Sequence, residues 1–366
     1  MDFEFSSDGL MLRDMLRKFL QKDARPLEMK FFNAGKLEAD ERARLRNAIE
    51  QMGLWAVTVP EKFGGGGLDA VTACLIEEEL GSTFVPIEMG DVTPLLFECT
   101  PEQAARYLEP VLAGQRTPVM AAREPGAVRP EGWRTTASPD GEAFVLEGVK
   151  SLGTAPGAEA FFIVLARAQE GLTAFLLDRE RPGLQLSVNG KPTLKLEACR
   201  VERAALLGQP GHALASMADE ACRAWIRTGA RYVGMAARLM EMGAEHARDW
   251  VSLGEPLSVR PAVRRLLAEL SVDIESARWL VYRAAWLADS GQPLRGPSAQ
   301  VRLGTGEMLL RAIDRVTMIF GGPGPAPQIS AQRMVRSMVS AEALELALEY
   351  ARAALAAEVL AAAVER

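Results

Sequence analysis

The sequence predicts an α+β protein in three consecutive parts: an all-α N-terminal domain at 1–116, a middle antiparallel β-sandwich or barrel at 117–210, and a C-terminal four-helix bundle at 211–366. Two observations lead to this prediction. Apolar residues recur at helical spacing in the first and last parts, whereas the middle part has short alternating runs separated by turn signals. A length of 366 residues also allows two or three domains.

The N-terminal part reads as a series of helices. Ser6 or Ser7 can cap a first helix whose apolar residues between Leu10 and Leu20 form one broad face. The four glycines at 64–67 predict a loop, since the Lys-Ser/Thr pair of a phosphate-binding loop does not follow them. Further helices are expected at 38–53, 68–82 and 101–113.

The middle part reads as a run of strands. Residues 135–150 contain two alternating runs around a Pro-Asp-Gly turn, and the stretches AFFIVLARA and LTAFLLD are candidates for buried strands. The stretch LQLSVNGKPTLKLEAC continues the pattern. A separate β domain of about 90 residues is therefore expected.

The C-terminal part has long amphipathic segments joined by short connections rich in glycine and proline, as a four-helix bundle requires. The aromatic residues of the second segment, Trp279, Tyr282 and Trp286, favour a core or interface role over a cofactor site. The expected helices span 212–250, 259–291, 296–320 and 328–363.

Composition weighs against several classes of function. A net charge of -6 offers no footprint for nucleic acid. The four cysteines are far apart, so they are expected to be thiols in a reducing compartment, and neither histidine has a plausible metal or nucleophile neighbour in sequence, so no metal is expected. The acidic N-terminus and the lack of a long apolar run predict a cytoplasmic protein without a membrane span.

The stretch TMIFGGPGPAPQ, residues 317–328, allows two interpretations. Glycine at a helix C-cap, followed by proline, ends a helix. Glycine also lacks a Cβ and therefore allows a ligand to approach the backbone closely. The local sequence favours helix termination.

Eight phrases resemble the acyl-CoA dehydrogenase family, in the family's order and along essentially the whole chain. The resemblance implies an FAD enzyme of lipid metabolism that removes two hydrogens from the α and β carbons of an acyl-CoA thioester. It further implies a glutamate base, an electron-transfer flavoprotein as partner, and a tetramer in which each FAD lies across two subunits. The phrases are MGLWAVTVPEKFGGGGLD, EEELG, EPGA, LEGVK, FLLDRERPGLQL, ACRVERAALLG, ARWLVYRAAW and FGGPG.

The resemblance assigns cofactor contacts to two segments. Gly321, Gly322 and Gly324 match the family's double-glycine turn, which implies that they lie beside the FAD of the neighbouring subunit. This favours the ligand interpretation of the turn. Thr154 matches a family position whose hydroxyl donates to the flavin ring.

Other family positions are changed in this chain. The segment that begins at Arg123 lacks the hydroxyl residues of the family pattern, and Arg123 and Ala127 are its expected substrate-binding residues. Trp250 stands where the family has an arginine for the FAD diphosphate, and Pro261 stands where it has a glutamine. Tryptophan cannot make the charge-assisted bonds of arginine, so Arg260 is the candidate substitute.

The catalytic base is expected at Glu342. In the family it lies in a Glu-Gly-Thr stretch six residues after an Arg-x-x-Arg pair, which Arg333 and Arg336 match here. Ala343 and Leu344 replace Gly-Thr, and Glu342 also reads as one of several glutamates on the solvated side of a helix.

Three functions remain open, because the changes cluster on cofactor contacts. In the first, the chain is one subunit of a heterotetramer that acts on a bulky acyl-CoA, for example a steroid-derived one. Alternatively it is a homotetrameric dehydrogenase with unconventional FAD contacts, or a flavin-free scaffold that holds acyl-CoA or a partner.

Overall fold

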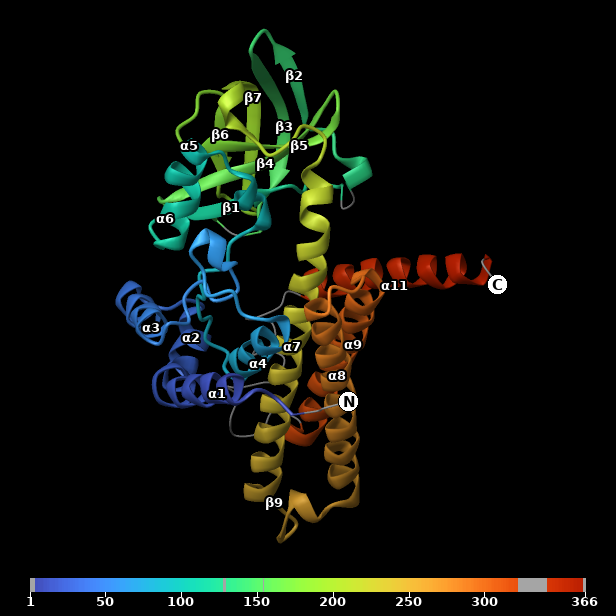
Figure 1. Ribbon diagram of the computed structural model, residues 1–366. Coiled ribbons are helices and arrows are strands. Elements are labelled where there is room, and N and C mark those ends of the chain that lie inside the picture. The colour runs from blue at the N-terminus through green and yellow to red at the C-terminus, as the bar shows by residue number, and fades with distance from the viewer. Residues whose placement is uncertain (1–3, 128–129, 154, 322–340, 365–366) are drawn as a thin grey trace. The chain divides into compact units, whose positions relative to one another are not determined.

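The computed structural model describes residues 4–127, 130–153, 155–321 and 341–364, with the backbone alone at 341–347 and 362–364. The chain divides into two compact units (Figure 1). The helical unit comprises residues 1–58, 67–89 and 221–366, and the β unit comprises 59–66 and 90–220. Segments from both ends of the chain therefore share one unit. The sequence-based boundaries near 116 and 210 stay predictions, since the units follow packing and not chain order.

Helices α1, α3 and α4 begin within two residues of the predicted starts, whereas α2 was not predicted. Ser6 caps the first helix, because its hydroxyl accepts a hydrogen bond from Gly9 N at 3.1 Å. A π turn at Leu20–Ala24 and a 3₁₀ turn at Arg25–Leu27 continue the chain into the second helix. The helices are α1 (Ser7–Phe19), α2 (Glu28–Ala34), α3 (Ala39–Gln51) and α4 (Ala70–Leu80).

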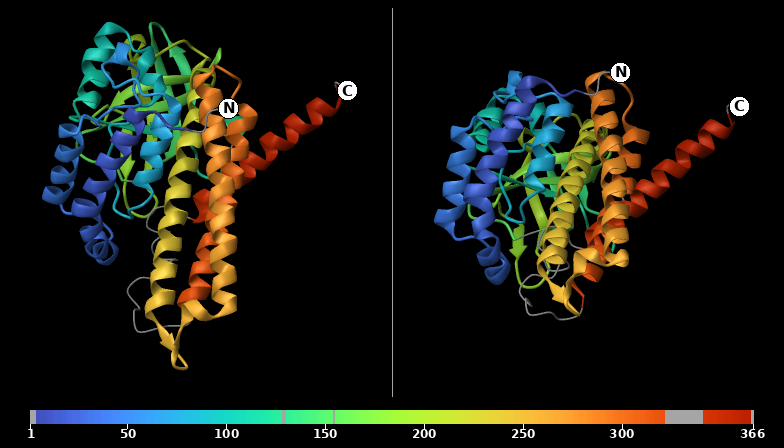
Figure 2. Two further views of the ribbon diagram at one scale, coloured as in Figure 1. Left: turned by 60° about the horizontal axis from the view of Figure 1, so that its bottom comes forward. Right: turned by 90° about the horizontal axis from the view of Figure 1, so that it is seen from below.

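Three long bundle helices lie side by side in both views of Figure 2, in yellow and orange. Their bounds confirm the predicted segments within a few residues, whereas residues 328–340 of the fourth predicted helix lie outside the described residues. Tyr282 is buried in the core, whereas Trp279 and Trp286 are exposed. The helices are α7 (Ala213–Asp249), α8 (Pro261–Asp289), α9 (Arg295–Phe320) and α11 (Ala341–Val364).

Helix α4 joins the two cores of the helical unit. Cys74 and Leu75 pack into the bundle core, whereas Ile76 and Leu80 pack with α1, α2 and α3. A helix that is apolar on opposite faces must be covered on both of them. None of the described helices has both the length and the apolar character that a membrane span requires.

The consecutive glutamates Glu77–Glu79 of α4 bind arginines from three different helices. They pair, in sequence order, with Arg231 of α7 at 2.7 Å, with Arg278 of α8 at 2.9 Å, and with Arg17 of α1. A buried carboxylate is costly unless a cation or N–H group compensates it. The acidic run thus holds α4 against three neighbours at once.

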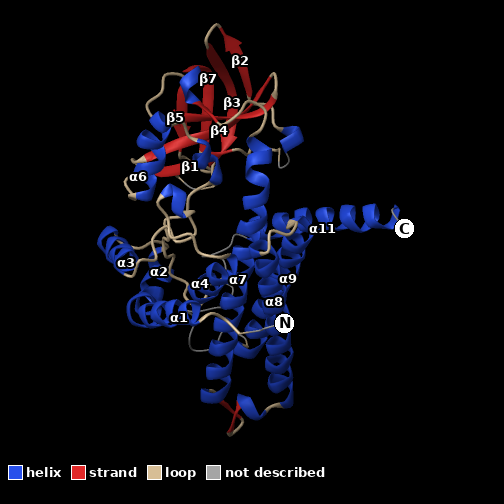
Figure 3. Cartoon of the chain, viewed as in Figure 1, coloured by secondary structure: helices blue, strands red, loops and turns tan. Residues whose placement is uncertain are grey.

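Within the described residues, eight strands form one mixed sheet in the β unit, with the order β6-β7-β3-β2-β4-β5-β8 and β1 beside β4. Figure 3 shows all of these strands in red, and the short β9–β10 hairpin, also in red, is a separate sheet that belongs to the helical unit. The strands are β1 (Thr117–Ala121), β2 (Thr136–Asp140), β3 (Ala143–Ser151), β4 (Ala160–Ala168), β5 (Gly171–Asp178), β6 (Leu184–Ser187), β7 (Thr193–Glu202), β8 (Leu206–Leu207), β9 (Val251–Ser252) and β10 (Glu255–Pro256).

The prediction of a purely antiparallel sheet was wrong at two pairings. Strand β1 runs parallel to β4 over its whole length, and β2 is parallel to β4 at Thr136 and Arg167. Parallel neighbours need a crossover connection. The β2–β3 hairpin and the chain after it return the backbone to the start of β4, so β1 and β4 point the same way.

Strand β4 is buried on both faces, which explains its continuous apolar run. Phe161, Ile163 and Leu165 pack against the helical turns at 94–112. Phe162 and Val164 on the other face share a core with residues of β3 and β7. The sheet therefore curves so that its two halves pack against each other, as a sandwich does.

Candidate functional site

The segment Arg123–Ala127 forms a tight turn shortly after β1. Ala127 N donates to Glu124 O at 3.1 Å, and Gly126 has a φ of 74°. Proline followed by a glycine with positive φ at the two central positions is the signature of a type II turn. Arg123, Pro125 and Gly126 are exposed along its rim. The structure thus places Arg123 and Ala127 in one turn, and their substrate-binding role stays a prediction.

A second exposed segment lies beside this turn. Ser151 N donates to Arg123 O at 2.9 Å, so the end of β3 is bonded directly to the turn. Gly153 is exposed, and apart from its chain neighbours no heavy atom of the described residues lies within 4 Å of the position that a Cβ would take there. Thr154, the predicted donor to the flavin ring, lies outside the described residues.

A buried ion pair lies beneath both segments. Lys150 Nζ donates to Glu124 Oε1 at 2.8 Å and to Ala122 O at 3.0 Å. The same carboxylate accepts hydrogen bonds from Arg134 N at 2.6 Å and from Thr135 N at 2.8 Å. The Lys150 side chain has 0% exposure and that of Glu124 has 8%, so neither charge faces solvent.

Burial and the partner act in opposite directions on these two groups. Burial raises the pKa of Glu124, but the Lys150 ammonium and the hydrogen bonds from residues 134 and 135 outweigh it and lower the pKa to about 2. Burial lowers the pKa of Lys150, and Glu124 opposes that effect. The carboxylate is therefore ionised at neutral pH.

This pair was not predicted from the sequence, although one signal for it is present. Side chains alternate between the two faces of a strand, so Leu146, Gly148 and Lys150 of β3 share the inward face. A lysine at an inward position requires a partner. The partner is unpredictable from β3 alone because it comes from a turn 26 positions earlier.

Trp250, Arg260 and Gly321 lie at one end of the bundle. His246 of α7 stacks on the Trp250 ring at 5.7 Å between centroids, and it contacts the Phe320 ring at the end of α9 at 4.6 Å. Arg260 precedes the first residue of α8, which begins at the same end. The structure thus brings together three positions that the sequence comparison singled out separately.

Arg260 is engaged within its own hairpin. Its Nη2 donates to Ser252 O at 2.9 Å, and its Nη1 lies 3.8 Å from a carboxylate oxygen of Glu255. The guanidinium charge is therefore shared with a nearby carboxylate. Trp250, with 40% exposure, presents an indole at the position of the family arginine.

Gly321 ends helix α9, as one interpretation of its glycine-rich turn predicts. It has a φ of 74°, and its N–H donates to Thr317 O at 3.1 Å. Among the described residues other than its chain neighbours, no heavy atom lies within 4 Å of a Cβ built on it, so these residues leave its backbone open to close approach. Gly322 and Gly324 lie outside the described residues, and all three assignments to FAD stay predictions.

Glu342 lies in the described part of helix α11, and its side chain is not among those that the structure describes. The family's Glu-Gly-Thr stretch therefore corresponds to regular helix in this chain. Its assignment as catalytic base stays a prediction.

The described residues fit an FAD cofactor in part. The open backbone at Gly153, Gly126 and Gly321 fits a group that comes close to the chain. The side chains of Trp250 and Arg260 fit a diphosphate less well, because an indole carries no charge and the guanidinium is partly neutralised.

In chain order, the described residues form N-terminal helices, a mixed sheet and a helical bundle. Two family models match the chain: "Acyl-CoA dehydrogenase, N-terminal domain" at residues 6–115 and "Acyl-CoA dehydrogenase, C-terminal domain" at residues 223–361. The chain belongs to the acyl-CoA dehydrogenase family, a class of oxidoreductases. This confirms the family that the sequence phrases indicated.

Individual relatives match nearly the whole chain. The (R)-benzylsuccinyl-CoA dehydrogenase of Thauera aromatica is 29% identical over 98% of this chain and 97% of its own. The structure of butyryl-CoA dehydrogenase from Megasphaera elsdenii is 22% identical, with a TM-score of 0.83, and covers 98% of this chain and 100% of its own. A structure described as the FAD complex of PigA is 20% identical, with a TM-score of 0.83, and covers 98% of this chain and 99% of its own. The two solved structures share the fold.

Proposed function

We propose that this chain serves in the FAD-dependent α,β-desaturation of an acyl-CoA thioester, as one subunit of a heterotetramer with a related chain. FAD, when bound, accepts the hydride from the β carbon of the acyl group. Family membership and the FAD complex of a structural neighbour support the cofactor. An electron-transfer flavoprotein is the proposed electron acceptor.

One observation carries the heteromeric part of the proposal. At the end of the bundle where the family binds the diphosphate of a neighbouring subunit's FAD, this chain presents the Trp250 indole, and Arg260 is bonded to its own hairpin. A diphosphate needs charge-assisted donors. A related chain that has an arginine at the position of Trp250 would supply these charge-assisted donors to an FAD whose flavin ring is held on this chain's β unit.

The β unit would hold the flavin ring and the thioester. The turn from Arg123 to Ala127 and the segment before Thr154 form its exposed rim. The N–H groups of Ala127, Ser151 and Leu152 already donate within the chain, so the donors to a developing enolate oxygen would be other groups of the site. A thioester α-proton is weakly acidic, so a base works only if this oxygen is stabilised. We propose Glu342 as that base.

We propose a bulky, ring-containing acyl group as substrate, for example a steroid-derived one. The relative from Thauera aromatica is named for an acyl-CoA that carries a benzyl group, which supports a substrate with a ring. The acyl group itself is identified by turnover with a panel of straight-chain and ring-containing acyl-CoA thioesters, where equal turnover of all of them contradicts this choice.

The test is the visible spectrum of the purified protein. Expressed alone, the chain is expected to be colourless, and co-expressed with a related chain encoded next to it, to yield a yellow complex with flavin absorption. In that complex, Glu342→Gln is expected to remove desaturation while leaving the flavin spectrum unchanged. Full activity of this variant places the base on the companion chain.

Two other results contradict the heteromeric proposal. A chain that is yellow by itself, with one flavin per chain, is a homomeric dehydrogenase with unconventional FAD contacts. A chain that stays colourless alone and with every related companion is a scaffold without flavin.

A further inference from the structure

The side chain of Lys150 is fully enclosed beneath the exposed rim of the β unit. Its ammonium binds Ala122 O and the Glu124 carboxylate, and it lies 5.3 Å from the centroid of the Trp133 ring. With 0% exposure it cannot contact a ligand on the rim. Any effect of Lys150 on a ligand must therefore act through the residues that it holds.

Glu124 connects three separate parts of the chain. Its carboxylate binds Lys150 of β3 and the backbone N–H groups of residues 134–135, which precede β2. The turn is held at its other end by the Trp133 indole, whose Nε1 donates to Ala127 O at 3.2 Å. The turn, the end of β3 and the start of β2 are thus tied to one carboxylate.

Stability alone does not account for a buried ion pair at this place. Removing two charges from water is costly, and replacing such a pair with apolar groups of similar volume is often neutral or stabilising. What the pair supplies is a defined geometry, because each of its hydrogen bonds has a preferred length and direction.

The geometry of the backbone matters more here than side-chain hydroxyls do. The family pattern places a threonine and a serine in this segment, whereas this chain has Arg123 and no hydroxyl residue through Pro130. Any contacts that this turn makes to a flavin ring would then come from its backbone, next to residues 151–153, which precede the predicted donor Thr154. Their spacing is set by the Ser151 N to Arg123 O bond and by the ion pair below it.

We propose that Lys150 and Glu124 are positioning residues that hold the Arg123–Ala127 turn and residues 151–153 in the geometry that binds the flavin ring. This inference rests on the proposed function. It assigns the pair no direct contact with the flavin and no part in proton transfer.

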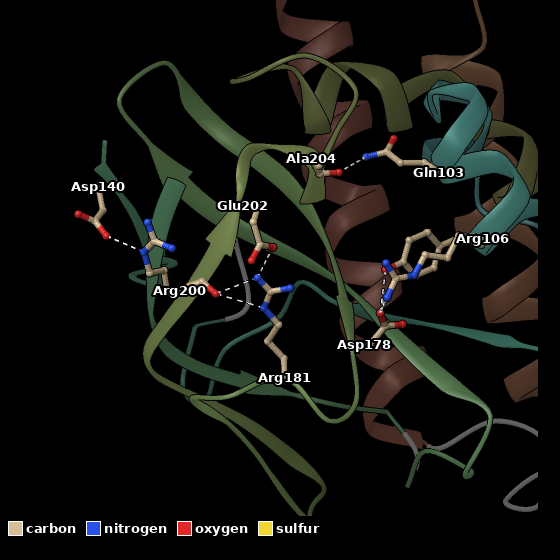
Figure 4. Close-up of polar contacts among 9 residues, drawn as sticks. Gln103, Arg106, Asp140, Asp178, Arg181, Arg200, Glu202 and Ala204 are labelled. Carbon is tan, nitrogen blue, oxygen red and sulfur yellow. Dashed lines mark hydrogen bonds and ion pairs between the residues drawn. The ribbon is translucent and has the colours of Figure 1, made fainter. Parts of the chain in front are cut away.

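The experiment compares two neutral double variants of the flavin-containing protein, as the chain alone or the complex, whichever binds FAD. Lys150→Met with Glu124→Gln removes the pair's charges and keeps one acceptor oxygen for the two N–H groups of residues 134 and 135. The matched control, Arg200→Met with Asp140→Asn, removes an ion pair of 2.9 Å between β7 and β2 of the same unit, whose two side chains are more than half exposed (Figure 4).

Melting temperature, the dissociation constant for FAD and the flavin spectrum are measured on each protein. The Lys150/Glu124 double variant is expected to melt near the wild type but to bind FAD at least about tenfold more weakly, with shifted absorption maxima, because misplaced contacts lose affinity. The control is expected to bind FAD as the wild type does.

A conservative variant covers the case in which the double variant does not fold. Glu124→Asp keeps the charge and withdraws the carboxylate by about 1.5 Å, one carbon–carbon bond. It is expected to weaken FAD binding although the ion pair survives.

If the folded double variant or Glu124→Asp binds FAD with wild-type affinity and has the wild-type spectrum, this inference is overturned. The proposed function is then unaffected. A wild-type protein that contains no flavin, alone or with a companion, overturns the proposed function and this inference together.

Discussion

Glu124 makes the stability of the β unit depend on pH. Its folded-state pKa of about 2 lies below the ordinary glutamate value of 4.5, because the ion pair and N–H donors outweigh burial. A lowered carboxylate pKa stabilises the folded state above the ordinary value, and this contribution is lost as pH falls towards the folded-state value. The shift corresponds to about 3 kcal/mol at neutral pH.

We therefore expect Glu124→Gln to destabilise the protein most at neutral pH. The difference in free energy of unfolding between this variant and the wild type should shrink as pH falls from 4.5 towards 2. Urea unfolding, followed by far-UV circular dichroism, measures this difference at each pH. Glu142→Gln, on the exposed turn between β2 and β3, controls for loss of one negative charge. A difference that is constant across this pH range would show that the ion pair does not act in this way.

At the scale of the elements, helices α4 and α7 approach each other through glycines. A Cβ on Gly234 of α7 would lie 1.9 Å from Glu78 O, and one on Gly81, just after α4, would lie 2.3 Å from Arg231 O. No side chain fits at such distances from backbone atoms. The close approach brings the glutamates of α4 within reach of arginines on α7 and α8.

Gly234→Ala is expected to destabilise the protein by about 2 kcal/mol or more, because the helices must move apart. Gly243→Ala on the same helix is the matched control. Its Cβ would lie 3.5 Å from Val316, an ordinary contact, and alanine favours a helix interior by up to about 1 kcal/mol over glycine. Urea unfolding compares the two variants, and equal effects would contradict the proposed helix contact.

At the scale of the whole molecule, each compact unit has its own cores. In the helical unit, the cores form around α4 and the bundle, whereas those of the β unit lie on the two faces of β4 and β5. Apolar burial is the main stabilising contribution in each. Local stability should then differ between the units.

Hydrogen exchange of the Gly234→Ala variant tests this independence. Amides of α8 and α9 are expected to lose protection, whereas those of β4 and β5 should exchange as in the wild type, because the substitution disturbs only the helical cores. Mass spectrometry of peptides from each strand and helix reports both at once. Equal loss of protection in the two units would mean that the whole chain unfolds as one cooperative body.

The sequence by itself determined the long helices, the main strands and the family. Ser6 as a cap, the alternating runs around the Pro-Asp-Gly turn and the apolar run of β4 follow local rules of spacing and hydrogen bonding, which act between residues near in the chain. Phrases spread over the chain were enough to indicate acyl-CoA dehydrogenases, as the family models then confirmed.

Only the tertiary structure decided the contacts between distant residues. The parallel pairing of β1 with β4, the Lys150–Glu124 pair and the fit of Gly234 against α4 each join segments whose separation in sequence carries no fixed separation in space. Local patterns state which face of an element is inward, but the partner on that face depends on how the whole chain packs.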